Sequence, residues 1–597
     1  MPGIVGLITK RPRQWAELQL RRMLEVIRHE DFYTTGTWCD ESCGVYVGWT
    51  AHADGFASTM PVHDERGGKV LVFSGEEYRG HQSKADGPSY LIGLYERDLS
   101  FPSTLNGRFH GLLSDKLRGT TQLFNDRYGM HRLYYHDAKD ALYFAVEAKA
   151  ILAVRPDLRR LDARGLGEFV TCGCVLENRT LFDEIHVLPP ASSWTFRRGS
   201  IERKQRYFEA SEWEQQCPLE PDQYHNALRE TFSRNLPHYF NGRQRIGMSL
   251  TGGLDTRLVM AWQKFQPGKL PCYTYADSDR ECRDVVVARR VARACDQPHE
   301  VIRLGDDFLS DFPYYAERSM YLTDGCVDVT RASDLYLSER ARTIAPVRMT
   351  GLYGDEILRP QIRAFKPMEP SPRIFAGSFL PYLSAARETY QELIQGHPLS
   401  FAAFRQAPWH HFGILALEQT QLTVRTPFLD NQFVRTAFQA PPTATTNNDL
   451  RVRLIGDGDG MLQRILTDRG FAGTGGRVSS WVSRNFLELT FKAEYAYDYG
   501  MPQWVAQVDH VLSPLHLERL FLGRHKVFHY RVWYRDVLSK YVREMLLDAR
   551  TLARPYVERN GVEAIVRGHL SGRRNYTKEI HRLLSIELLH RLFVDSR

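Results

Sequence analysis

Short runs of alternating polarity dominate the first two hundred residues and predict β-strands. They fall at 3–9, 45–49, 70–74, 112–115, 121–125, 133–135 and 142–146. Apolar residues at helical spacing instead predict helices over 15–29, 88–96 and 149–154. This order of elements favours stacked antiparallel sheets with helices on the outside, an α+β arrangement.

The pattern changes in the second half, where strands and helices alternate. Apolar runs at 246–250 and 270–275 predict buried strands, and each is followed by a helical pattern, over 255–265 and 284–295. Alternation of this kind is typical of an α/β domain with a doubly wound parallel sheet, which binds ligands at the carboxyl ends of its strands. Amphipathic helices over 527–597 predict a helical C-terminal extension, either structural or a surface for a partner.

The first candidate site lies where the strand at 246–250 turns into its helix. Gly252 and Gly253 allow backbone N–H groups to point into one concavity, and the start of a helix favours an anion such as a phosphate. Asp255 beside a phosphate implies a cation between them, which indicates Mg²⁺. An ordinary βα turn is the structural alternative, since Gly-Gly is common there.

A second glycine turn follows an apolar strand that begins at Val347. It carries two adjacent carboxylates, Asp355 and Glu356, after Gly354. Gly-Asp-Glu alone is usually a solvated loop. Paired with Asp255 at this distance after the first glycine turn, it favours a functional site.

Length and composition limit the class of protein. A chain of 597 residues predicts two or more domains, and 43% hydrophobic with 25% charged residues is typical of a globular protein in water. No apolar run approaches a membrane span, and the N-terminus has the wrong order for a signal peptide, so we expect a cytoplasmic protein with no membrane contact. The net charge of +7 suits an anionic ligand, and no basic run predicts nucleic-acid binding. The nine cysteines show neither a disulfide framework nor zinc spacing.

Thr251-Gly252-Gly253-Leu254-Asp255-Thr256 resembles the Ser-Gly-Gly-x-Asp-Ser loop of ATP-pyrophosphatases, and the chain as a whole resembles the asparagine synthetase family. The resemblance implies an adenine nucleotide α-hydrolase-like fold, with ATP and Mg²⁺ as cofactors, and Asp255 and Asp355 as the catalytic metal ligands. The nucleotide-binding residues that it implies are Leu250, Thr251, Gly252, Gly253, Leu254, Asp255, Thr256, Tyr275, Thr350 and Gly351.

Two departures affect this synthetase half. Leu352 replaces the family's glutamate that serves in amide formation, while Tyr353 stands near a tyrosine that serves in β-lactam-forming relatives and is therefore a candidate catalytic residue. The family's lysine for pyrophosphate has no single counterpart. Arg477, Arg484 and Lys492 all remain candidates, and arginine is not equivalent to lysine as a point charge.

The first half resembles the glutaminase domain of class II amidotransferases, an Ntn-hydrolase-like fold. Its motifs include Met1-Pro2-Gly3-Ile4-Val5-Gly6, Ser74-Gly75-Glu76-Glu77-Tyr78 and Asn125-Asp126-Arg127-Tyr128-Gly129. We place this domain at 1–208 and the synthetase domain at 221–597, with the boundary near 205–220. The family's Arg-x-Pro-Phe-Leu-Asp motif is matched at 425–430, where Asp430 is expected to cap a helix starting at Asn431.

Three departures concern glutamine hydrolysis. Pro2 stands where the family has its nucleophilic cysteine, Ser74 replaces the asparagine that stabilises the oxyanion, and no arginine for the substrate carboxylate occurs over 46–52. We therefore expect no glutaminase activity, and Glu76 and Asp86 become fold residues rather than ligand holders.

These features predict a C–N ligase that activates a carboxylate as an acyl-adenylate and does not take nitrogen from glutamine. The resemblance extends to β-lactam synthetases and lasso-peptide macrolactam cyclases, so the expected partners are a small-molecule or peptide carboxylate and an amine. The sequence leaves open a homodimer and a pathway protein partner. The alternative is a catalytically impaired scaffold or regulatory nucleotide-binding protein.

Overall fold

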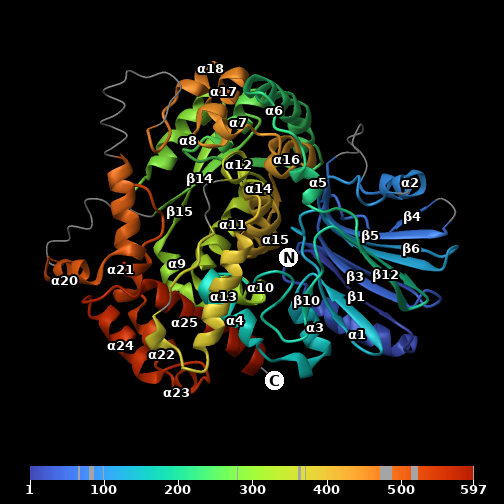
Figure 1. Cartoon of the computed structure of the whole chain (residues 1–597), viewed down its shortest axis with the longest axis horizontal. Helices are drawn as coiled ribbons and strands as arrows, with labels where there is room; N and C mark the ends of the chain where they lie inside the picture. Colours follow the sequence, from blue (N-terminus) through green and yellow to red (C-terminus); the bar gives the residue numbers. More distant parts are fainter. Residues whose placement is uncertain are drawn as a thin grey trace.

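The structure, a computed structural model, describes residues 1–64, 67–78, 87–98, 100–277, 280–360, 365–369, 371–470, 487–512 and 522–595. Asp86, Arg477 and Arg484 lie outside the described residues. Figure 1 shows the N-terminal half, in blue to teal, beside a larger C-terminal half that continues from green to red.

Two six-stranded antiparallel sheets form the N-terminal half. One has the order β10-β8-β9-β1-β3-β2 and the other β12-β11-β7-β6-β5-β4. The strands are β1 (Gly3–Thr9), β2 (Tyr33–Asp40), β3 (Val45–His52), β4 (Val62–His63), β5 (Lys69–Glu77), β6 (Gly107–Asp115), β7 (Thr120–Asn125), β8 (Tyr134–Asp137), β9 (Ala141–Ala145), β10 (His186–Val187), β11 (Ser192–Arg197) and β12 (Ser200–Arg206). The predicted stacked antiparallel sheets are confirmed.

Strand β1 shows why the sheets stack. Ile4 and Ile8 belong to the core between the two sheets, whereas Val5 and Leu7 belong to the core on the other face of their sheet. Side chains alternate along a strand, so a strand that is apolar on both faces must be covered on both. The N-terminal helices include α1 (Arg13–Val26), α2 (Tyr90–Arg97), α3 (Ala148–Val154) and α4 (Ala163–Cys172), and α1 packs against β1, β3 and α3.

A five-stranded parallel sheet forms the centre of the C-terminal half, in the order β15-β14-β13-β16-β17. Its strands are β13 (Ile246–Ser249), β14 (Cys272–Asp277), β15 (His299–Leu304), β16 (Val347–Met349) and β17 (Thr423–Arg425). The chain runs outward from β13 through β14 to β15, then returns to the other side of β13 for β16. The predicted doubly wound sheet is therefore present, and its topological switch point lies between β13 and β16.

Helices surround this sheet and build the C-terminal extension. The first group is α5 (Ser211–Glu214), α6 (Pro221–Asn235), α7 (Asp255–Trp262), α8 (Arg283–Ala294), α9 (Asp306–Ser310), α10 (Phe312–Leu322), α11 (Ala332–Ile344), α12 (Gly354–Leu358) and α13 (Leu380–Leu393). The second is α14 (Pro398–Phe401), α15 (Phe412–Gln421), α16 (Asn431–Ala437), α17 (Asp449–Gly458), α18 (Gly460–Arg464) and α20 (Gln503–Leu512). The extension ends with α21 (Tyr530–Arg535), α22 (Ser539–Leu546), α23 (Ala549–Leu552), α24 (Arg559–Leu570) and α25 (Thr577–Leu589), red in Figure 1.

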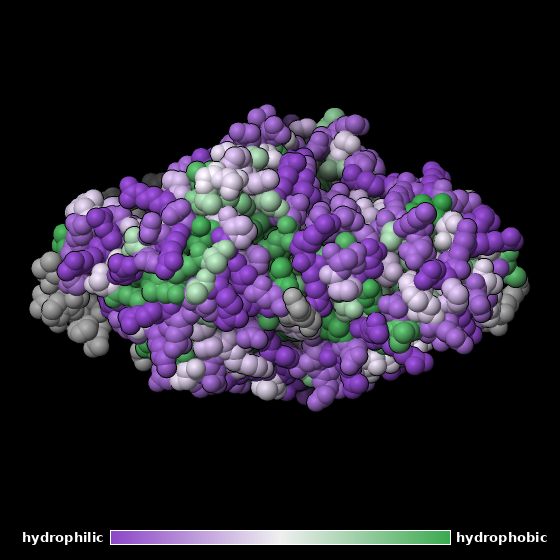
Figure 2. Space-filling model, turned by 90° about the horizontal axis from the view of Figure 1, so that it is seen from below, coloured by the Kyte–Doolittle hydropathy of each residue, from purple (hydrophilic) through white to green (hydrophobic). Residues whose placement is uncertain are grey.

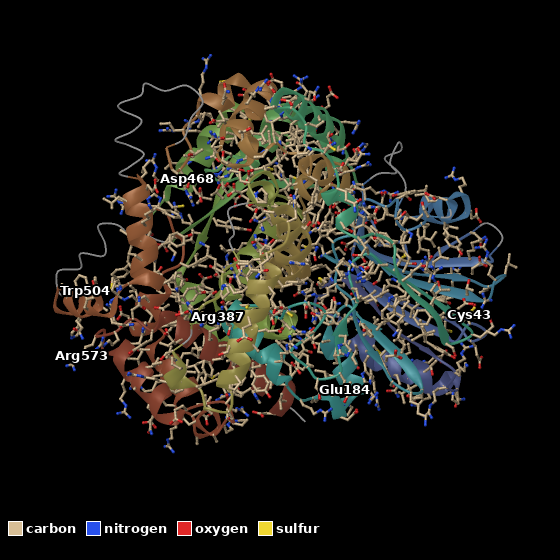
Figure 3. All side chains as sticks on the ribbon, viewed as in Figure 1. Cys43, Glu184, Arg387, Asp468, Trp504 and Arg573 are labelled. Carbon is tan, nitrogen blue, oxygen red and sulfur yellow. The ribbon has the colours of Figure 1, made fainter. Side chains whose placement is uncertain are left out.

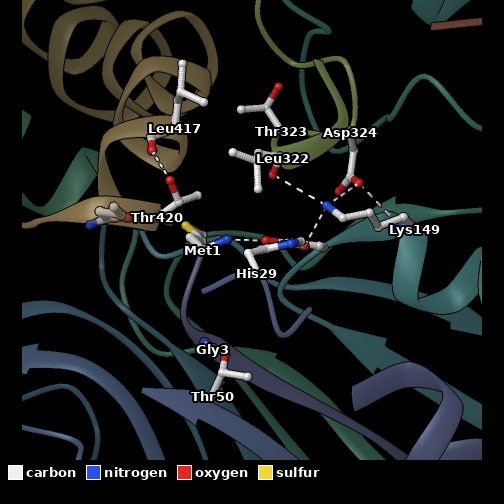
Figure 4. Close-up of polar contacts among 12 residues, drawn as sticks. Met1, Gly3, His29, Thr50, Lys149, Leu322, Thr323, Asp324, Leu417 and Thr420 are labelled. Atoms are coloured by element: carbon white, nitrogen blue, oxygen red, sulfur yellow. Dashed lines mark hydrogen bonds and ion pairs between the residues drawn. The ribbon is translucent and has the colours of Figure 1, made fainter. Parts of the chain in front are cut away.

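Buried charges join the two halves. Glu147 accepts hydrogen bonds from the Met1 amino group and from His29 Nε2, and its partner Lys149 forms an ion pair with Asp324 of the other half at 3.1 Å (Figure 4). Burial alone would raise the pKa of Glu147, but the surrounding His29, Lys149 and Met1 amino group lower it overall. These contacts hold the edge of the N-terminal domain against the loop after α10.

A second group of contacts uses the residues of the 425–430 motif. Asp430 Oδ1 accepts the backbone N–H groups of Gln432 and Phe433 at 2.9 and 3.1 Å, so the predicted cap of the helix at Asn431 is confirmed. Its Oδ2 accepts from the Asn106 side chain of the N-terminal half at 2.8 Å. The same aspartate thus caps a helix and ties the halves together.

The outer surface is mostly polar on the face drawn in Figure 2, where hydrophobic residues gather in recesses near the middle. Among the residues that the structure describes, no helix combines the length and the apolar character needed to cross a membrane.

Candidate active site

The candidate nucleotide loop lies at the switch point of the parallel sheet. Strand β13 ends at Ser249, the turn follows, and helix α7 begins at Asp255. The side-chain oxygens of Thr251 and Thr256 lie 3.3 Å apart, so the hydroxyls hold the two ends of the turn together. In an open α/β sheet this crevice is the usual ligand site.

A buried arginine anchors the loop from behind. Arg257, in the first turn of α7, is only 1% exposed and donates to the carbonyl oxygens of Gly252 and Leu466, at 3.3 and 3.5 Å. Its pKa is lowered to about 10 because burial disfavours the charged guanidinium. These hydrogen bonds fix the shape of the glycine turn against the segment after α18.

Two carboxylates flank the same turn. The backbone N–H of Gly252 donates to Asp284 Oδ1 at 2.7 Å, and the N–H of Asp468 donates to the Gly252 carbonyl at 3.3 Å. Asp468 is labelled in Figure 3, close to the green helix α8 that carries Asp284. Burial, and then the charge of Asp468, raise the pKa of Asp284 to about 6. A phosphate that approaches this N–H group must therefore displace a carboxylate.

The two predicted metal ligands come together through a third residue. Arg451 of α17 donates to Asp255 Oδ1 at 2.8 Å and forms an ion pair with Asp355 Oδ1 at 2.9 Å. Asp355 also forms a two-pronged ion pair with Arg359, at 2.6 and 3.0 Å. Asp255 and Asp355 thus face a common point, as the sequence predicted, and the four charges balance.

Close backbone packing brings the second loop against the first. A Cβ atom added to Gly354 would lie 2.5 Å from Cγ of Asp255, and one added to Gly351 would lie 2.6 Å from the backbone nitrogen of Thr256. No side chain fits at either position without moving the backbone. The two glycines therefore let Asp255, which follows β13, and Asp355, which follows β16, approach the same point.

Two half-buried carboxylates at this point, Asp255 and Glu356, have raised pKa values. Burial raises the pKa of Asp255, although Arg451 opposes the shift. Burial, followed by the charges of Asp255 and Asp355, raises the pKa of Glu356 to about 7. Displacement of Arg451 would therefore leave negative charge at this point for a bound cation to neutralise.

This carboxylate pair fits Mg²⁺ as the sequence analysis proposed. Mg²⁺ in nucleotide enzymes commonly takes one or two carboxylates and completes its shell with waters and phosphate oxygens. Within the described ranges no group of three or more His, Cys, Asp or Glu side chains is placed to hold a metal. Asp255 and Asp355 would therefore hold Mg²⁺ only together with a nucleotide, with Arg451 displaced from between them.

Tyr353 lies next to the carboxylates but is turned into the protein. It is 2% exposed, its φ is 71°, and its hydroxyl is buried without a hydrogen-bond partner. Burial raises its pKa. Leu352 is half-buried, and its carbonyl oxygen accepts from the Thr426 hydroxyl at 2.7 Å. The other predicted contacts, Leu250, Thr350 and Tyr275, lie at or next to the carboxyl ends of β13, β16 and β14.

The structure adds basic residues that the sequence analysis did not select. Of the three candidates for the pyrophosphate lysine, Lys492 pairs with Glu488 at 2.8 Å and is 71% exposed, and the two arginines lie outside the described residues. Arg451, 6% exposed, instead lies between the aspartates. No local pattern in the sequence singles out Arg451.

A separate cavity lies where the N-terminal half meets the C-terminal half, at the position of the departures from the glutaminase motifs. Pro2, Ser74, Gly75, Arg108 and His131 line it, and no lining residue is a cysteine. Ser74 Oγ lies 3.0 Å from His131 Nε2. Glu76, predicted to be a fold residue, forms an ion pair with Arg425 of β17 across the interface between the halves. The cavity thus offers no thiol to attack an amide.

Comparison with known proteins agrees with this architecture. A family model for the glutamine amidotransferase domain matches residues 1–208, and one for asparagine synthase matches residues 227–413. Asparagine synthetase [glutamine-hydrolyzing] 1 of Bacillus subtilis (strain 168) is 22% identical over 60% of this chain and 58% of its own length. Asparagine synthetase [glutamine-hydrolyzing] 2 of the same strain is 23% identical over 60% of this chain and 51% of its own length.

A fungal relative also matches. Amidase chry2 of Gibberella zeae is 23% identical over 50% of this chain and 49% of its own length. The matched region thus spans only about half the length of these relatives. Both domain models, the parallel sheet with its glycine loop and the two asparagine synthetase relatives agree, and the chain belongs to the asparagine synthetase family.

Proposed function

We propose that this protein is an ATP-dependent amide-forming ligase that activates a carboxylate as an acyl-adenylate and receives its nitrogen from an amine other than glutamine. The observation that carries the proposal is the convergence of Asp255 and Asp355 beside the glycine loop, at the switch point of the sheet. The absence of a thiol among the residues lining the N-terminal cavity supports the second part.

The proposed reaction has two steps. A carboxylate oxygen of the substrate attacks the α-phosphorus of ATP, an acyl-adenylate forms, and pyrophosphate leaves. The nitrogen of the amine then attacks the acyl carbon, the amide bond forms, the amine loses a proton, and AMP leaves. Mg²⁺, when bound, neutralises charge on the phosphates. The chain's own residues would orient the groups: the N–H groups of the glycine turn would bind the phosphates after Asp284 moves away from Gly252, and Asp255 and Asp355 would hold the metal in place of Arg451.

Two residues have proposed roles at the second step. Glu356, which follows Asp355 directly in the chain, is proposed to take the proton that the amine loses. Tyr353 is proposed to act through its hydroxyl, which has no partner in this conformation. The phenol is buried, so its role depends on a movement that brings the hydroxyl to the substrate.

An exchange assay tests the proposal. Radioactive pyrophosphate is incubated with ATP, Mg²⁺ and pooled amino acids, peptides or cell extract as carboxylate sources. We expect label to enter ATP only when a suitable carboxylate is present, and Asp255→Ala to abolish the exchange. ATP binding without exchange from any carboxylate source would contradict the ligase proposal.

A non-catalytic scaffold is the second candidate, and specific contacts favour it. Arg451 already spans the two carboxylates, and Asp284 already accepts from Gly252. In this conformation both the cation position and one phosphate-binding N–H group are satisfied internally. Double substitution of Asp255 and Asp355 by alanine distinguishes the candidates, because a scaffold would still support its pathway.

A further inference from the structure

The cavity of the N-terminal half contains a buried arginine whose charge is not balanced. Arg108 of β6 is 7% exposed, and its Nη1 atom has no hydrogen-bond partner. Within the described part of the chain no carboxylate forms an ion pair with it. An isolated buried guanidinium costs several kcal/mol, so such a group is normally paired or meets a ligand.

The carboxylate that faces Arg108 across the sheet, Glu76, is already engaged by other donors. Glu76 lies directly opposite Arg108 in the pairing of β5 with β6. However, the Glu76 carboxylate accepts hydrogen bonds from Nε and Nη2 of Arg425 and from the Tyr78 hydroxyl. The bond from Tyr78 is 2.8 Å long. A carboxylate has about four acceptor positions, and these three donors, one of them shared between both oxygens, take up most of that capacity. One negative charge therefore faces two guanidinium groups, and the cluster keeps one uncompensated positive charge.

Other buried nitrogens line the same cavity. His131 bonds Ser74 through Nε2, and His52 bonds the Gln419 carbonyl through Nε2 at 2.9 Å, while Nδ1 of each ring has no partner. Burial lowers the pKa of both histidines, to about 4 for His52, so both rings are neutral at pH 7 and Arg108 is the only cation among the lining residues. Ala51, Phe56, Leu422 and Val424 give the remaining wall an apolar character.

We infer that this cavity binds a small aliphatic monocarboxylate through Arg108. A guanidinium group matches a carboxylate in charge and in its paired donors, and the single uncompensated charge selects a monoanion over phosphate. The cavity volume of about 60 Å³ corresponds to about four water-sized volumes of roughly 15 Å³ each. It therefore accepts a ligand the size of acetate or propionate.

The cavity lies between the halves, which gives the ligand a route to the synthetase site. Leu422, Thr423 and Val424 of its wall belong to β17 and the residue before it, and β17 is the neighbour of β16 in the parallel sheet. The charge of Arg108 also reaches the buried phenol of Tyr353. A bound carboxylate would neutralise this charge, so the site links occupancy of the N-terminal cavity to the environment of Tyr353.

Equilibrium dialysis of the full-length protein against ¹⁴C-acetate tests the inference, with sodium chloride at equal ionic strength as background. We expect one saturable site per chain, and Arg108→Met should weaken binding by about thirtyfold or more. Asp255→Asn should leave acetate binding unchanged, which separates this cavity from the site of the substrate carboxylate. Binding that survives Arg108→Met, or that is lost in Asp255→Asn, overturns the inference.

Thermal unfolding supplies a second readout that does not depend on affinity. If Arg108 is an unpaired ligand-binding cation, Arg108→Met should raise the midpoint of unfolding without ligand and abolish the rise that acetate causes in the parent protein. An arginine with a merely structural role would lower the midpoint when replaced. An equal rise with chloride would overturn recognition of a carboxylate.

Discussion

Two clusters of carboxylates and arginines, one around Asp255 and Asp355 and one around Glu76 and Arg425, differ in charge and in exposure. Around Asp255 the cluster has two aspartates and two arginines, and the aspartates are 23% and 34% exposed. Around Glu76 it has one carboxylate and two arginines, all less than a tenth exposed. On the two proposals above, the open cluster exchanges Arg451 for a metal, whereas the closed cluster keeps its ion pair and binds an anion.

The largest effect is expected from neutralising the open cluster. Asp255→Asn removes the charge that faces both Arg451 and a metal, so we expect pyrophosphate exchange to fall by about a thousandfold, equivalent to ~4 kcal/mol. Asp306→Asn, at the first residue of helix α9, is the matched control and should change exchange little. Retention of more than a tenth of the activity in Asp255→Asn would mean that the two clusters do not differ in function.

A substitution in the closed cluster around Glu76 should change the free energy of unfolding. Glu76→Gln leaves Arg425 and Arg108 buried without a carboxylate, so we expect the free energy of unfolding to fall by about 3 kcal/mol. Denaturant titration measures this. Glu202→Gln, which removes the exposed ion pair with Arg197, should cost less than ~1 kcal/mol. Equal losses in the two variants would show that burial does not strengthen the Glu76 pair.

Arg451 tests whether the open cluster can bind a metal, because its guanidinium occupies the position that the metal would take. In Arg451→Met the aspartates are free, so we expect half-maximal exchange at about tenfold lower Mg²⁺ concentration, a gain of ~1.4 kcal/mol. A Mg²⁺ titration of the exchange rate measures this. An unchanged Mg²⁺ requirement would indicate that Arg451 and the metal bind the carboxylates together.

Asp284 predicts a pH dependence of stability. Its pKa is about 6 in the folded protein and about 4 in the unfolded chain, so the folded protein binds more protons between these values. Asp284 therefore opposes folding increasingly as the pH rises through that window. Asp284→Asn should raise the unfolding midpoint at pH 7.5 by about 2 °C and much less at pH 4. An equal rise at both pH values would exclude titration of Asp284 as the cause.

The smallest effect is expected at Lys492. Its ion pair with Glu488 is exposed, and such pairs contribute at most ~1 kcal/mol. Lys492→Ala should change exchange by less than about twofold. A hundredfold loss would mean that Lys492 reaches pyrophosphate in another conformation and that Arg451 does not replace the family's lysine.

Strong local patterns let the sequence predict much of this structure. Strand β1 has the predicted bounds of 3–9, and the loops at Thr251 and Gly351 were correctly placed after strands because apolar runs end there. Strand β12 was missed because its sequence, Ser-Ile-Glu-Arg-Lys-Gln-Arg, is almost wholly polar. It lies at the edge of its sheet, where one neighbour provides the hydrogen bonds and water covers the side chains.

The candidate site was only partly predictable, for a related reason. Asp255 and Asp355 follow adjacent parallel strands, so the fold class alone brings them together. Arg451 lies 196 residues after Asp255 on a helix with no distinguishing pattern, and only the tertiary structure places it between the aspartates. The unpaired state of Arg108 is equally invisible in the sequence, because it depends on Arg425 occupying Glu76 from the other half.

The ion pair between Glu76 and Arg425 has a consequence for how this protein can change over evolutionary time. One continuous hydrophobic core includes Val5 and Leu7 of the first half together with Met248 and Leu584 of the second. A C-terminal half produced alone would expose that apolar surface and leave Arg425 without its carboxylate. The first half would therefore be retained for the folding of the second, whether or not it carries out a reaction, and its cavity is free to acquire a new ligand.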